Sequence, residues 1–349
     1  MKKTTVLAIL FILSGMILAQ EPAQPCRVYF APPAPANMQP GNMDRPDFWS
    51  KAPASSRFRQ LRSGKKTEHP TVFHAVYNQN GLFLKAVCSE PEAAKLNFTD
   101  LGRKKDDSSS FDGPVVEVFI DPAFTRKHSA HFAANINGTL FDCLDRERIW
   151  EFPFTAKTVP AKDKKSFATY FFIPWRETTN ENPDSGYLFF MNLTDHPVIG
   201  FNIARERNYA VNEYSQWMVS AKAFMEPANY GVMVFSGCPN AEKRLLALLD
   251  RRIIANGIDF QGAVGPDSMK MLRKILEANL FGMKSLLDKM TDSAQKKSYL
   301  KRYQTLSQEV SGAKTFEQLK SLVSRCVQLA LDVEKYSLAQ MENDLFNMI

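Results

Sequence analysis

Between residues 41 and 236, hydrophobic positions come in short apolar or alternating runs that turn signals separate. Pairs such as Asn80-Gly81 and Asn137-Gly138 mark turns, because both residues tolerate a positive φ. Many short strands with few helical stretches are typical of an antiparallel β-sandwich of the immunoglobulin or jelly-roll kind. The strands that we predict are Thr71–Tyr77, Leu82–Cys88, Val115–Ile120, His131–Asn135, Phe167–Ile173, Tyr187–Leu193 and Gly231–Phe235.

From residue 240 onward the apolar positions recur at helical spacing, and Leu, Met, Lys and Gln replace β-branched and aromatic residues. Asn256-Gly257 is a helix-stop pair, while Pro266 and Asp267 are good residues for a first helical turn. The short connections between helices suggest an antiparallel α-helical bundle. The predicted helices cover residues 241–257, 266–290, 291–310 and 315–346.

The chain begins with the pattern of a signal peptide. Lys2 and Lys3 precede an apolar run over residues 6–18, and Ala19 is a small residue before a cut. A membrane anchor is the alternative, but this run is shorter than the ~20 residues that span a bilayer. We expect a secreted chain, periplasmic or extracellular, without stable membrane insertion after cleavage. The predicted parts are a signal peptide (1–19), a Pro- and Ala-rich lead-in (20–39), the β-sandwich (40–237) and a helical bundle domain (238–349).

Composition and charge narrow the class of protein. Of the 349 residues, 44% are hydrophobic and 23% are charged, which excludes wholesale disorder and a polytopic membrane protein. The net charge of +7 is spread along the chain without a basic stripe, so we expect no nucleic-acid partner. The five cysteines include no CxxC pair, and a bridge between Cys26 and Cys238 stays open.

Several segments stand in an order that resembles carbohydrate-binding module family 9 and related β-sandwiches. They lie between residues 40 and 236, and the helical part is outside the resemblance. The segments are Phe48–Ala52, the strand–turn–strand of residues 71–88, the acidic-apolar strand of residues 110–122, the Ile173-Pro174-Trp175 motif, and Trp217 followed by residues 224–235.

The resemblance implies a noncatalytic sandwich that holds the end of a sugar chain between two aromatic rings. By position these rings fall on Phe111 and Phe224, where the family more typically has Trp. Glu117 matches a carboxylate that accepts sugar hydroxyls, and Asn135 is a further polar partner. Trp150 stands in a charged context that favours an exposed loop. Trp150 and Trp217 are candidate ligand platforms.

The residues of the acidic strand support part of this interpretation. Period-2 alternation places Glu117 and Phe119 on one face of the strand. A carboxylate beside an aromatic ring suits a sugar, whose C–H groups stack while its hydroxyls need acceptors. A solvent-facing role for Glu117 and core packing for Phe111 and Phe224 are the alternatives. The resemblance also allows structural calcium, for which the crowded candidates are Asp106, Asp107 and Asp112.

Signals for an enzyme are few. We find no GxSxG, HExxH, phosphate-binding loop or dinucleotide fingerprint, and His128 and His131 read as surface histidines rather than zinc ligands. A glycan-active role or a haem-based redox role is a minor alternative. We expect noncatalytic carbohydrate binding connected with polysaccharide metabolism. The main alternative is a degenerate sandwich that acts as a structural or protein-interaction module, with the helical domain mediating assembly with a protein partner.

Overall fold

The computed structural model describes residues 25–99, 101–103, 105–146, 150–178, 189–209, 211–248, 258–262 and 266–347. The predicted signal peptide, residues 1–19, lies outside the described residues. Within the described part, none of the helices combines the length and the apolar character that crossing a bilayer requires.

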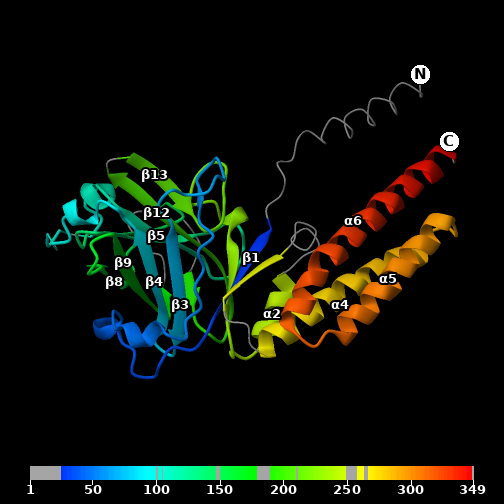
Figure 1. Cartoon of the computed structure of the whole chain (residues 1–349), viewed down its shortest axis with the longest axis horizontal. Helices are drawn as coiled ribbons and strands as arrows, with labels where there is room; N and C mark the ends of the chain where they lie inside the picture. The colour runs from blue at the N-terminus through cyan, green and yellow to red at the C-terminus, as the bar shows by residue number, and fades with distance from the viewer. Residues whose placement is uncertain are drawn as a thin grey trace, which may run out of the picture.

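Two β-sheets form the first half of the molecule (Figure 1). The larger sheet contains β1 (Cys26–Ala31), β2 (Arg59–Gln60), β5 (Val115–Asp121), β6 (Ala130–Asn135), β7 (Leu140–Leu144), β12 (Val198–Tyr209), β13 (Val211–Gln216), β14 (Gly231–Phe235) and β15 (Ile258–Gly262). Its main order is β15-β1-β14-β12-β5-β6-β7, and β13 and β2 branch from β12. The smaller sheet has the order β3-β4-β9-β8, with β3 (Thr71–Asn78), β4 (Gly81–Ser89), β8 (Thr155–Pro160) and β9 (Ser166–Pro174). The predicted strand at residues 187–193 appears as β11 (Phe189–Met191), which pairs with β10 (Arg176–Thr178).

A single hydrophobic core lies between the two sheets, which confirms the sandwich that the sequence predicts. On β5 the alternate residues Val116, Val118 and Ile120 enter this core. They meet side chains of the smaller sheet, among them Phe73, Leu84 and Phe171. The other residues of β5 point to the outer face of the larger sheet, which loops cover so that the whole strand is buried.

Strand β1 corrects the expectation of an extended lead-in at residues 20–39. It is an inner strand that pairs in parallel with both β14 and β15, so the larger sheet is not wholly antiparallel. Tyr29 and Ala31 contact the sandwich core, whereas Val28 and Phe30 belong to a second core that includes the helices. Because both faces are buried, the strand lacks the alternation by which a half-buried strand is recognised.

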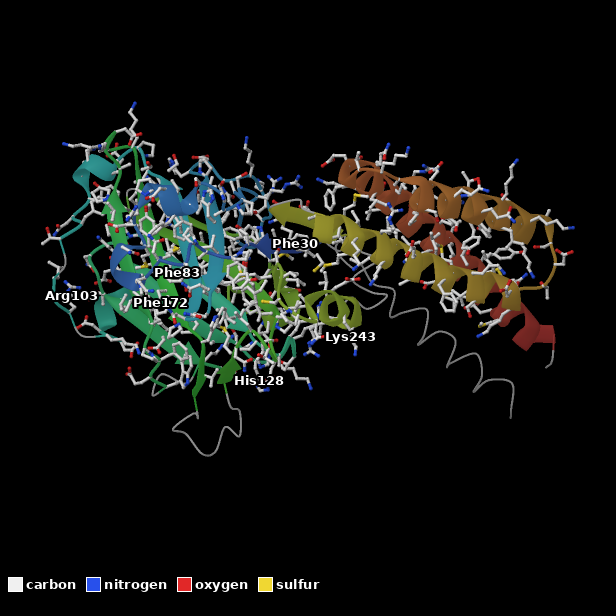
Figure 2. All side chains as sticks on the ribbon, turned by 90° about the horizontal axis from the view of Figure 1, so that it is seen from below. Phe30, Phe83, Arg103, His128, Phe172 and Lys243 are labelled. Carbon is white, nitrogen blue, oxygen red and sulfur yellow. The ribbon has the colours of Figure 1, made fainter. Side chains whose placement is uncertain are left out.

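The second half contains α2 (Ala241–Leu248), α4 (Pro266–Lys289), α5 (Ala294–Gly312) and α6 (Phe316–Asn347). The long helices α4, α5 and α6 pack together on an apolar stripe that includes Leu272, Leu306 and Leu329. The first predicted helix appears as α2 over residues 241–248, and the rest of it, residues 249–257, lies outside the described residues. Ile258–Gly262 is strand β15. Figure 2 shows Phe30 at the junction of sheet and helices, where its ring lies 6.0 Å from that of Phe260. The division of the chain into two domains stays a prediction, since β15 takes part in both halves.

The cysteines form no disulfide, so the bridge between Cys26 and Cys238 is not present. Cys88 and Cys326 are fully buried in the two cores. Cys238 Sγ lies 3.4 Å from the hydroxyl of Tyr77. Burial of apolar surface, rather than covalent cross-links, therefore holds the two halves together.

Candidate functional site

The outer face of the larger sheet gathers three titratable side chains. Glu117 on β5 lies opposite Ala204 of β12, and Glu206 follows two residues later on the same face. His131 on β6 lies opposite Phe119, and its Nε2 is 2.7 Å from Glu117 Oε2. Glu117 and His131 are 3% and 7% exposed, so His131 is not the surface histidine that we expected.

Burial sets the protonation of this cluster. Loss of hydration raises the pKa of Glu117 to about 8. Burial and the neighbouring Glu117 together raise the pKa of Glu206 to about 7. The pKa of His131 falls to about 3, chiefly because burial disfavours the imidazolium. Near neutral pH the cluster therefore carries much less charge than its residue types suggest.

The cluster predicts a fall in stability as the pH rises. Between the ordinary carboxyl value of 4.5 and the raised values of about 7 and 8, the folded chain keeps protons that the unfolded chain releases. The lowered pKa of His131 acts in the opposite direction up to its ordinary value of 6.5. Above that pH the free energy of unfolding should decrease until about pH 8, and Glu117→Gln should flatten the dependence. Urea unfolding of both proteins from about pH 6.5 to 8.5 measures it. Equal slopes for the two proteins would contradict the assignment.

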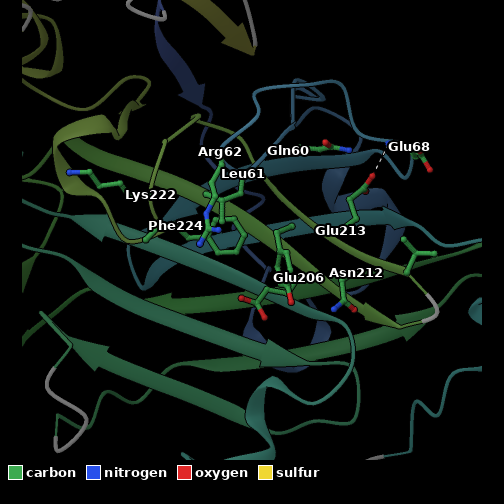
Figure 3. A pocket seen from close by; sticks show the side chains of 12 residues that line it. Gln60, Leu61, Arg62, Glu68, Glu206, Asn212, Glu213, Lys222 and Phe224 are labelled. Carbon is green, nitrogen blue, oxygen red and sulfur yellow. Dashed lines mark hydrogen bonds between the residues drawn. The ribbon is translucent and has the colours of Figure 1, made fainter. Parts of the chain in front are cut away.

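Beside this cluster, over β12 and β13, the surface opens into a cleft of about 710 Å³ (Figure 3). Glu206 and Asn212 lie in its middle, and Phe224 lies at one end. The ring of Tyr214 is 6.4 Å from that of Phe224 and is 36% exposed, whereas Phe224 is 7% exposed. The cleft thus combines one accessible ring, one mostly covered ring, and carboxyl and amide groups.

The structure separates the two predicted clamp residues. Phe224 lines the cleft, but Phe111 does not. Phe111 is half-buried against Phe141, with the ring centroids 5.1 Å apart, and lies 6.2 Å from His131. His131 in turn stacks on Phe119, which contacts Phe224, so a row of packed rings occupies the face between the predicted partners. Their roles in binding stay predictions.

Asn135 has a structural position at the end of β6. Its side chain is 1% exposed, and its amide nitrogen donates to the carbonyl oxygens of Ser110 and Asp112. Its side-chain oxygen accepts from the backbone N–H of Asn137 at 3.2 Å. Glu117 is likewise beneath the surface, and of the two carboxyl groups only Glu206 lines the cleft. Neither Asn135 nor Glu117 lines the cleft, and their roles in binding stay predictions.

Trp150 and Trp217 require a correction as ligand platforms. They are 1% and 0% exposed and belong to the sandwich core. Trp150 packs on Phe132, although charged residues precede it in sequence. Trp217 donates from its indole nitrogen to Ser55 Oγ at 2.9 Å. No ring face of either residue is open to a sugar.

Sequence reasoning missed Tyr214, Asn212 and Arg62 in the cleft. Val211 and Tyr214 are two of the exposed large hydrophobic side chains, 65% and 36% exposed. A strand whose side chains are polar and exposed on one face carries little apolar periodicity. The only signal was an aromatic residue among polar ones in the segment of residues 211–216.

The acidic candidates for calcium are largely engaged elsewhere. Asp107 accepts from the backbone N–H and the hydroxyl of Ser109. Asp106 lies near Asp142 and Glu151, and each offers an oxygen within 4.8 Å of the others. However, Lys105 Nζ is 2.5 Å from Asp142 and 2.6 Å from Glu151, so an ammonium group already pairs with two of the three carboxyl groups. Because Ca²⁺ takes six to eight oxygen ligands, calcium binding stays a prediction.

Comparison with solved structures shows similarity to carbohydrate-binding modules. No protein-family model and no curated protein matches the chain. A family 9 carbohydrate-binding module from Caldicellulosiruptor kristjanssonii, in complex with cellotriose, is 18% identical over 62% of this chain and 96% of its own, with a TM-score of 0.41. A family 9 module from that organism in complex with glucose is 17% identical over 60% of this chain and 96% of its own, with a TM-score of 0.40. A Bacteroides uniformis protein whose proposed role is carbohydrate binding is 11% identical over 60% of this chain and 99% of its own, with a TM-score of 0.45. At such identities and TM-scores, neither a function nor a residue assignment of this chain follows from these matches.

Proposed function

We propose that this protein binds carbohydrate noncovalently in the cleft over β12 and β13 and performs no chemistry on it. The observation that carries the proposal is the cleft itself, in which the accessible ring of Tyr214 lies near Phe224 and shares the lining with polar side chains. Sugars present C–H groups that stack on aromatic rings and hydroxyls that need hydrogen-bonding partners. We further propose that the chain acts outside the cytoplasm, on the strength of the sequence pattern of residues 1–19.

The geometry of the carboxyl groups supports binding rather than hydrolysis. Glycoside hydrolysis usually needs two carboxyl groups that both reach the scissile bond, ~5–9.5 Å apart across a cleft. Three carboxyl groups line the cleft here: Glu206 in its middle, and Glu213 and Glu68 toward one end. Glu213 accepts two backbone N–H groups, and Glu117 is buried behind the cleft against His131. Glu206 is therefore assigned to hydrogen bonding with a ligand, in which its carboxyl group can accept or donate.

Calorimetric titration of residues 25–349 with a panel of neutral and charged oligosaccharides tests the proposal. Binding can be weak, so the protein should be concentrated enough to detect millimolar affinity, about −4 kcal/mol. Tyr214→Ala should weaken binding by about tenfold or more, because the accessible stacking surface is lost.

Phe111→Ala is the matched control. It removes an aromatic side chain from the same face of the sheet, outside the cleft, and should leave the affinity unchanged. If Phe111→Ala loses binding while Tyr214→Ala binds as wild type does, the result would instead favour the clamp that the resemblance implies. No heat with any sugar, from a chain that still unfolds cooperatively, would refute carbohydrate binding and favour assembly through the helices.

A further inference from the structure

A hairpin with a high density of basic residues forms one wall of the cleft. Residues 57–66 contain Arg57, Arg59, Arg62, Lys65 and Lys66 and no acidic residue. Strand β2 within this segment pairs with β13, whose residues 211–214 line the cleft. Arg62 enters the lining, and Lys222 joins it from the loop after β13. Figure 3 shows both cations at the Phe224 end, and Glu68 at the opposite end beyond Glu213.

Backbone hydrogen bonds fix the main chain at Arg62 beside β13. The N–H of Leu61 donates to the carbonyl oxygen of Tyr214 at 2.8 Å, and the N–H of Arg62 donates to that of Ser220 at 3.1 Å. Arg62 has a φ of 66°, a left-handed conformation that glycine would adopt without strain.

The cations of the cleft have no partner in the described parts of the chain. Arg57 pairs with Asp259, but no ion pair joins Arg62, Lys65 or Lys222 to a described carboxylate. An exposed cation without a partner can bind an anion and lose no internal contact.

The acidic residues of the cleft oppose these cations only weakly. Glu213 is directed toward the Glu68 end of the cleft, where its two carboxyl oxygens accept the backbone N–H groups of Glu68 and His69 at 2.8 and 3.3 Å. Glu206 has a raised pKa of about 7, so it carries a partial charge near neutral pH. Glu68 lies at the same end as Glu213, away from the cations. The Phe224 end is therefore locally positive.

We propose that the sugar bound in this cleft is anionic, with a carboxylate or sulfate group held by Arg62 and Lys222 while its ring stacks on Tyr214. The proposal rests on the proposed function and adds the chemical class of the ligand. A guanidinium group presents paired N–H donors that match the two oxygens of a carboxylate or a sulfate.

The test compares three tetrasaccharides that share a galactose skeleton. Their units are neutral galactose in the first, galacturonate in the second and sulfated galactose in the third. Residues 25–349 are titrated with each by calorimetry, at about 50 mM and about 300 mM salt. The acidic sugars should bind at least about tenfold more tightly than the neutral one, and higher salt should weaken only the acidic sugars. Preference for galacturonate over the sulfated sugar, or the reverse, names the anionic group.

Arg62→Gln and Lys222→Gln should each remove most of this preference, since each variant deletes one cation and keeps a polar side chain. Lys162→Gln, in the exposed turn between β8 and β9 of the smaller sheet, is the matched control and should keep the preference for acidic sugars.

Equal affinity for neutral and acidic tetrasaccharides would overturn the anionic assignment and leave carbohydrate binding intact. Equal binding of a single-stranded oligonucleotide would also overturn it, because charge alone would then suffice. If the folded chain binds none of these ligands and no sugar of the neutral panel, both proposals are overturned.

Discussion

Glu90→Gln is expected to lower the free energy of unfolding by about 3–5 kcal/mol, because it leaves two buried guanidinium groups without their counter-charge. Glu90 is fully buried, and its carboxylate accepts from Arg205 at 3.1 Å and from Arg207 at 2.7 and 3.0 Å. Arg205 is equally buried and also donates to the carbonyl oxygens of His69 and Ser89. The network joins β12 of the larger sheet to the end of β4 in the smaller one, so its loss should weaken the whole sandwich.

The pH dependence of this effect has a definite sign. Burial by itself favours a neutral carboxyl group, but the hydrogen bond from Arg207 and the two guanidinium charges outweigh it and hold the pKa of Glu90 below its usual value. The stabilisation is therefore present above the unfolded pKa and is lost as the pH falls through the folded one. The difference between wild type and Glu90→Gln should shrink on acidification.

Glu92→Gln is the matched control for urea unfolding at neutral pH. Glu92 is two residues away, and its ion pair with Lys95 is solvent-exposed, with side-chain exposures of 36% and 66%. Exposed pairs contribute about 0–1 kcal/mol, so this variant should unfold close to wild type. If both variants lose similar free energy, the buried network does not have the role that we assign to it.

Sequence patterns predicted the elements in which one face is apolar and the other is polar. Strands β3 and β4 were predicted with their turn, because Asn80-Gly81 separates two apolar runs. Helices α4 to α6 were predicted because Leu and Met recur on one side of each. Strand β12 was missed, since its second half carries the buried charges of Arg205, Glu206 and Arg207. In sequence such a segment resembles a polar loop.

The candidate site was predicted less well than the fold, because it depends on contacts between distant segments. The sequence placed Glu117 and Phe119 on one face correctly, but it could not show that loops bury them. The cleft forms where the hairpin at residues 57–66 meets strand β13 and the loop at residues 222–224, which begin 145 residues further along the chain (211 against 66). No local pattern reports such a meeting, and the resemblance to a known family pointed only to Phe224.

A chain that starts at residue 38, near the predicted start of the sandwich, is expected not to fold cooperatively, whereas residues 25–349 should. Removing β1 takes an inner strand out of the larger sheet and leaves β14 and β15 with no partner between them. Val28, Tyr29 and Phe30 are each at most 3% exposed, and burial of such a side chain contributes about 1.5–3 kcal/mol. Their sum is comparable to the total stability of a typical protein, about 5–15 kcal/mol, before the lost strand pairing is counted. Thermal unfolding followed by near-ultraviolet circular dichroism measures the difference.

The strand can be tested apart from the length of the chain. Phe30→Ala in residues 25–349 should cost about 3–5 kcal/mol, since it opens a cavity against Phe260 and the helical core. A synthetic peptide of residues 25–37, added to the chain that starts at residue 38, should restore cooperative unfolding by supplying the missing strand. A chain from residue 38 that melts at the wild-type temperature without the peptide would show that β1 is dispensable. The sandwich would then be independent of the strand that connects it to the helices.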